Sequence, residues 1–96
     1  MHYHALAHRL NRPEEGAFWS PDSLLREIQV TLAALADIEL EYERNCERIE
    51  RLCPCEETRT RLRMERSRRR SCEREPYLRK LDGLQGRLRA HLTSGL

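Results

Sequence analysis

Aromatic side chains are scarce in this 96-residue sequence, and long apolar stretches are lacking altogether. It holds one Trp, three Tyr and one Phe. Nowhere does it approach the ~20 consecutive apolar residues that a membrane-spanning helix needs. Its first twelve residues also lack the apolar segment that is typical of a secretory signal peptide. We therefore expect a cytoplasmic protein with no membrane partner.

The motifs of common catalytic sites are missing as well. The sequence has no Gly-rich phosphate loop, no nucleophile elbow and no zinc-protease motif. Apolar residues make up 39% and charged residues 35%, a balance that allows a narrow apolar interface between helices but not a deep core. Without a deep core we expect no enclosed pocket, and we predict that the protein is not an enzyme.

A long helix is predicted over residues 20–52. Ser20 can cap it, Pro21 suits the first helical position, and Asp22 lies at the positive end of the helix dipole. Side chains that alternate by three and four residues then predict the face that meets another helix. This face comprises Leu25, Ile28, Leu32, Leu35, Glu39, Tyr42, Cys46, Ile49 and Cys53.

A turn is predicted at residues 53–55, because the residue before Pro54 resists helical geometry. A second helix is expected over 56–75. Pro76 either kinks this arm or breaks it, so that residues 76–93 continue the helix or form a third one. The short turn favours a single all-α domain, a long antiparallel helical hairpin. Residues 1–19 are predicted to form an N-terminal arm that contains a short helix.

The charges predict how the two arms align. Near the turn, the first helix carries Glu and the second carries a helical stripe of Arg, whereas both helices carry Leu farther away. Folding at the turn places residue i opposite residue 109 − i, which pairs unlike charges and also pairs apolar side chains. The expected charge pairs are Glu39 with Arg70, Glu43 with Arg66, and Glu50 with Arg59.

A second apolar strip is predicted to one side of this helix–helix interface. It comprises Leu24, Ile38, Ile49, Met64 and Leu78. A single hairpin would leave the strip in water, so we expect two copies to pair into a four-helix bundle. The leading prediction is a small non-catalytic scaffold that acts through protein–protein contacts as a homodimer and with a protein partner that the sequence does not identify.

The uneven distribution of charge supports an alternative function. Net charge is −6 over residues 1–57 and +8 over residues 58–96, and segment 59–74 is rich in arginine. Such a segment can neutralise phosphates, which predicts a nucleic-acid-binding regulator. In the predicted alignment most of these arginines face glutamates of the first helix. The side chains left for nucleic acid are Arg61, Arg68 and Arg69.

Cysteines at and near the turn support a second alternative, a metal or redox sensor. Cys46, Cys53 and Cys55 can approach one another, whereas Cys72 lies opposite residue 37 in the predicted alignment. Zinc sites use four ligands, so a second copy of the chain would have to complete this one. Free cysteine is also an ordinary small apolar side chain in a reducing compartment. We expect no cofactor, with zinc as the alternative.

Overall fold

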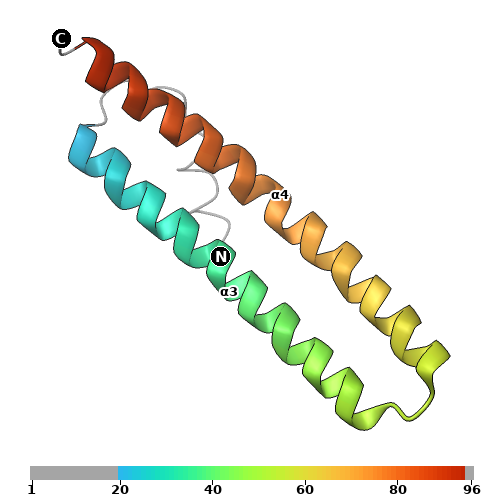
Figure 1. Cartoon of the computed structure of the whole chain (residues 1–96). Coiled ribbons are helices and arrows are strands. Elements are labelled where there is room, and N and C mark those ends of the chain that lie inside the picture. Colours follow the sequence, from blue (N-terminus) through green and yellow to red (C-terminus); the bar gives the residue numbers. More distant parts are fainter. Residues whose placement is uncertain (1–19, 95–96) are drawn as a thin grey trace, which may run out of the picture.

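The computed structural model describes residues 20–94, which form two long antiparallel helices joined by a short turn (Figure 1). Helix α3 spans Pro21–Leu52 and helix α4 spans Glu56–Ser94. At ~1.5 Å per residue the helices are roughly 48 and 58 Å long. Within this range the protein is an all-α hairpin without strands. The short N-terminal helix predicted in residues 1–19 lies outside the described residues.

Helix α3 begins at the residues that the sequence indicates. The backbone of Ser20 is extended, with φ −72° and ψ 161°, and its hydroxyl accepts a hydrogen bond from the backbone N–H of Ser23 at 3.2 Å. Pro21 follows at the start of the helix, where a backbone N–H would have no helical partner. The helix ends at Leu52, and Cys53 leaves helical geometry just before Pro54.

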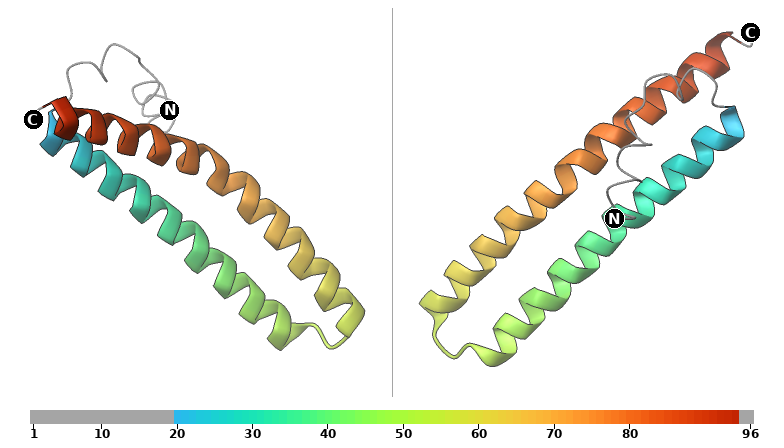
Figure 2. Two further views of the ribbon diagram at one scale, coloured as in Figure 1. Left: turned by 45° about the horizontal axis from the view of Figure 1, so that its top comes forward. Right: turned by 180° about the vertical axis from the view of Figure 1, so that it is seen from behind.

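Helix α4 runs through Pro76 without a break. The predicted alternative of a separate third helix over 76–93 is therefore wrong, and the second arm is one helix. A proline inside a helix removes one backbone hydrogen bond, but packing against α3 along its length stabilises the helix on both sides of that position. α4 bends along its course beside α3 (Figure 2, left).

The most buried side chains lie between the helices. Leu24 is 0% exposed, Thr31 1% and Leu84 2%. Thr31 is tolerated in this apolar setting because its hydroxyl donates to the backbone oxygen of Glu27 at 2.7 Å. These contacts lie in the half of the hairpin that is far from the turn.

The predicted face of α3 needs a correction. Leu25 and Leu32, expected in the interface, are 46% and 48% exposed, whereas their neighbours Leu24 and Thr31 are buried. The other seven predicted residues are buried or half-buried, namely Ile28, Leu35, Glu39, Tyr42, Cys46, Ile49 and Cys53. Most of the predicted face is therefore confirmed, and the helix is rotated by less than one residue position, about 40°, toward Leu24 and Thr31. Apolar spacing alone does not fix a rotation this small.

Candidate interaction surface

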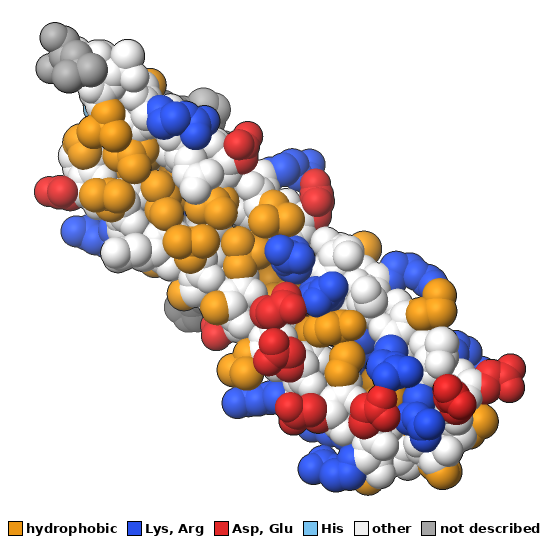
Figure 3. All heavy atoms as spheres, in the orientation of Figure 1, with side chains coloured by type: hydrophobic (Ala, Val, Ile, Leu, Met, Phe, Trp, Pro, Cys, Tyr) orange, Lys and Arg blue, Asp and Glu red, His pale blue; other side chains and the backbone are white. Residues whose placement is uncertain are grey.

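Ion pairs join the helices near the turn. The Glu50 carboxylate accepts a hydrogen bond from Arg63 and lies 3.6 Å from Nε of Arg59. The expected pair of Glu50 and Arg59 is thus present, with Arg63 as a second partner. Figure 3 shows charged side chains gathered over the half of the molecule near the turn and hydrophobic side chains over the other half.

A second group of side chains connects the middle of the hairpin. Nη1 of Arg70 donates to Oε1 of Glu39 at 2.9 Å, so this expected pair is also present. The Arg70 guanidinium lies over the ring of Tyr42, 4.1 Å from its centroid. A hydrogen bond with the Cys46 side chain and, next, burial raise the pKa of Tyr42. Glu39 and Arg70 each remain partly exposed, so the group fixes the alignment more than it adds stability.

The remaining charge pairs differ from the expectation. Along the described helices, no ion pair joins Glu43 to Arg66. Instead, Lys80 Nζ donates to Glu27 Oε1 at 3.0 Å in the apolar half. The sequence analysis did not predict this pair. In the predicted alignment Glu27 faces residue 82, which is two positions from Lys80, the only lysine of the sequence.

The turn is held by a side chain of α4. Nη1 of Arg59 donates to the backbone oxygens of Cys53 and Pro54, at 2.8 and 3.0 Å. Cys55 precedes the first residue of α4, and its backbone oxygen accepts from the N–H of Arg59 at 3.0 Å. Hydrogen bonds from the backbone N–H and then the hydroxyl of Thr58 lower the pKa of Cys55. These hydrogen bonds at the start of α4 favour the thiolate form of the exposed Cys55.

The cysteines do not form a ligand cluster within one hairpin. Cys46 and Cys53 are partly buried, Cys55 and Cys72 are exposed, and all four thiols are free. Among residues 20–94, no group of three or more His, Cys, Asp or Glu side chains is close enough to hold a metal ion. The zinc and redox readings of Cys46, Cys53 and Cys55 stay predictions.

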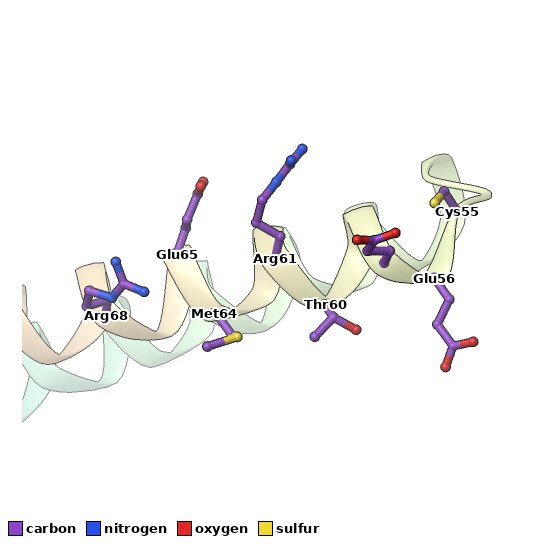
Figure 4. Close-up of a pocket in the computed structure, with 8 residues that line it drawn as sticks. Cys55, Glu56, Thr60, Arg61, Met64, Glu65 and Arg68 are labelled. Atoms are coloured by element: carbon purple, nitrogen blue, oxygen red, sulfur yellow. The ribbon is translucent and has the colours of Figure 1, made fainter.

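The arginines that the sequence predicts to bind nucleic acid lie on the outward side of α4 near the turn. Arg61 and Arg68 are exposed, and Arg69 pairs with Glu73 along the same helix at 3.1 Å. Figure 4 shows the open depression here, where Arg61 and Glu65 project from one side of α4. Because every lining side chain comes from this helix and the residue before it, the depression encloses no ligand. The acids within it also offset the positive charge. Nucleic-acid binding stays a prediction.

Exposed leucines of both helices form an apolar flank beside the helix–helix interface, in the half far from the turn. We use this name for Leu25, Leu32, Leu78 and Leu92, which are 46%, 48%, 38% and 63% exposed. Seven residues separate the first two and fourteen the last two, so each pair shares one side of its helix. Hydrophobic side chains cover both helices continuously in this half (Figure 3).

This flank replaces the strip predicted from the sequence. Leu24 and Ile49 belong to the buried interface and Ile38 is half-buried, whereas Leu78 and Met64 are exposed as expected. The difference follows from the rotation of α3, which buries Leu24 and turns Leu25 and Leu32 outward. Neither described helix is long and apolar enough to cross a membrane.

No protein-family model, curated protein or solved structure matches this chain. The geometry of the hairpin is therefore the basis for a functional proposal.

Proposed function

We propose that this protein is a non-catalytic interaction module that acts through protein–protein contacts, and that its apolar flank pairs with a second copy in a four-helix bundle. The observation that carries the proposal is the exposure of four leucines from two helices on one flank. Scattered surface leucines are ordinary, whereas an apolar surface that continues across two helices is typical of an interaction site.

Energetics support pairing. Complete burial of an exposed leucine side chain contributes about 1.5–3 kcal/mol, and because the flank leucines are already about half covered, each contributes about 0.7–1.5 kcal/mol in each of the two copies. The hairpin itself buries few side chains completely, with Leu24 and Leu84 as its main contribution. Two-helix proteins of this size have little interior, and oligomerisation is a common way to increase it.

A second copy is a suitable partner because homodimer interfaces are self-complementary around a two-fold axis. The apolar flank lies on both helices, so two hairpins can place α3 of one against α4 of the other. Each copy then covers the flank of its partner, as in bundles made from pairs of hairpins.

The test is the solution mass of the full chain, measured by sedimentation equilibrium over a range of concentrations. We expect twice the chain mass of 11.4 kDa. Leu32→Glu and Leu78→Glu should each weaken dimerisation at least about tenfold, or about 1.4 kcal/mol, because each would bury an unpaired carboxylate.

Val30→Glu is the matched control. Val30 is 53% exposed, and two residues along a helix turn it about 200° away from Leu32. The same substitution there should leave the mass unchanged, and circular dichroism checks that all variants remain helical. A wild-type chain that stays monomeric at every concentration would contradict the proposal.

A further inference from the structure

We infer that the two hairpins of the dimer pair with their turns at the same end, so that an acidic ridge of α3 lies against a basic ridge of α4 in the other copy. The acidic ridge is Glu43, Glu47 and Glu50, and the basic ridge is Arg63 and Arg74. This inference rests on the proposed self-association and adds the orientation of the partner and the residues that select it.

Helical geometry places these ridges on the same flank as the leucines. Eighteen residues make five full turns of an α-helix. Glu43 follows Leu25 by that interval, and Glu50 follows Leu32 by the same interval. Each therefore projects in the direction of its leucine, which is exposed beside the interface. The acidic ridge continues the apolar flank along α3 toward the turn.

The same interval applies on α4. Arg74 lies eighteen residues before Leu92, and Arg63 lies fifteen residues before Leu78, which places it about 60° from that leucine around the helix. Glu56 lies eighteen residues before Arg74, so the first residue of α4 on this side is acidic. The basic ridge therefore continues the flank along α4. One face of the hairpin is thus apolar far from the turn and charged near it (Figure 3), with Glu43 and Glu47 on α3 and Arg63 and Arg74 on α4.

Several charged side chains of the two ridges can pair with a second copy of the chain. Across the described residues, the side chains of Glu43, Glu47 and Arg74 make no ion pair. Arg63 hydrogen-bonds to Glu50 but remains 40% exposed at its side chain. Both ridges can therefore make additional pairs without breaking those within the hairpin.

Only one two-fold arrangement matches this face to itself. An axis parallel to the helices puts α3 of each copy beside α4 of the other with both turns at one end. Leucines then meet leucines. At each of the two equivalent contacts Arg63 lies level with residue 46 of the other copy, between Glu43 and Glu47, whereas Arg74 lies level with residue 35, at the boundary with the leucines. Turning one copy end over end with full overlap would place leucines against charges. That arrangement would bury unpaired charges and is disfavoured.

Interface area argues against a partial overlap that uses the apolar halves alone. Two helices present a face about 20 Å wide, and over about 48 Å of length two copies bury about 2,000 Å² in total. Half of that overlap buries about 1,000 Å², which is near the lower limit for a specific interface. The arrangement with both turns at the same end therefore buries the larger interface area and places opposite charges together.

The position of Cys55 allows a direct test of orientation. We would label it with a nitroxide in a full-length chain whose other cysteines are replaced (Cys46→Ala, Cys53→Ala, Cys72→Ser), and measure the distance between the two labels of the dimer by pulsed electron resonance. Turns at the same end predict a distance of about 20–30 Å, whereas opposite ends predict more than about 48 Å, the length of α3.

Charge reversal tests the ridges themselves. Glu43→Arg with Glu47→Arg should weaken dimerisation at least about tenfold, because like charges then face each other. Asp37→Arg with Glu41→Arg is the matched control, with an equal change in net charge on the same helix. Asp37 lies five residues from Leu32, and Glu41 nine, which turns both away from the flank. The control should change the dissociation constant less than about twofold.

The outcomes separate the two proposals. A dimer with a short Cys55 distance and a specific loss on reversal of the ridge supports the inference. A dimer with a long distance, or equal effects of the two charge variants, overturns the orientation and leaves self-association intact. A chain that stays monomeric overturns both self-association and the orientation. The apolar flank would then be covered by a different protein or by residues 1–19.

Discussion

Arg70 of α4 hydrogen-bonds to Glu39 of α3 at 2.9 Å across the hairpin, although the two residues lie 31 positions apart in the chain. The same guanidinium lies over the Tyr42 ring. Its Nε is buried and has no hydrogen-bond partner among the described residues. Loss of Glu39 would therefore remove the one hydrogen bond that Arg70 makes to the described residues.

A double-mutant cycle should detect this coupling. With Glu39→Gln, Arg70→Gln and both together, we expect a coupling free energy of about 0.5–1 kcal/mol from urea unfolding, because the pair is only partly exposed. The pair of Arg69 and Glu73 within α4 is the control, since its arginine side chain is 68% exposed. That cycle should give about 0.2–0.5 kcal/mol. Equal coupling in both cycles would contradict a special role for Arg70.

Leu24 should be the most sensitive leucine of α3. It is 0% exposed, and Leu24→Ala should lower the free energy of unfolding by about 2–5 kcal/mol through lost burial and a residual cavity. Leu52→Ala makes the same change at a side chain that is 66% exposed, and it should alter stability by less than about 0.5 kcal/mol. Urea titration of both variants at one protein concentration measures the difference. Similar losses would mean that the interface does not lie where we place it.

Thiol chemistry should distinguish Cys55 from the other cysteines. Because Thr58 lowers the pKa of Cys55 in the folded protein, its alkylation by iodoacetamide should reach half of its maximal rate at a lower pH than in urea. Thr58→Val removes the hydroxyl donor but keeps the backbone N–H, and it should raise the midpoint partway. A chain that retains only Cys72, an exposed thiol within α4, is the comparison. An unchanged midpoint on unfolding would contradict the assignment.

The same pKa shift sets the sign of its effect on stability. A thiol whose pKa is lower in the folded state stabilises that state when it is ionised. Its contribution is complete above the pKa of the unfolded thiol and disappears as the pH falls through the lowered folded-state pKa. We expect Cys55→Ser to remove this alkaline stabilisation in urea titrations across pH, and Cys72→Ser to leave it in place.

Gly83 offers a gain in stability. It lies inside α4, and a Cβ built on it meets no atom within 4 Å. Gly83→Ala should therefore raise the free energy of unfolding by about 0.5–1 kcal/mol through lower chain entropy in the unfolded state. Ala90→Gly, at an exposed position of the same helix, should lower it by a similar amount. Thermal denaturation checks both signs, and a loss with Gly83→Ala would indicate a contact with a partner at this position.

Local rules account for the ends of the helices and their approximate alignment. Ser20 and Pro21 start α3 through capping, and Pro54 separates the arms because it restricts the residue before it. Opposite charges near the turn give the alignment that pairs Glu39 with Arg70. These features depend on neighbours in sequence or on one long pattern, so they can be deduced without coordinates.

Only the tertiary structure decided which side of α3 is buried and whether α4 continues past Pro76. Leu24 and Leu25 both fit three-and-four spacing, and the choice between them depends on how α4 packs against the whole helix. Continuity at Pro76 is likewise decided by packing on both sides of the lost hydrogen bond. The sequence by itself determined a hairpin with matched charges. The rotation of its helices, a collective result of side-chain packing, decided which leucines remain exposed.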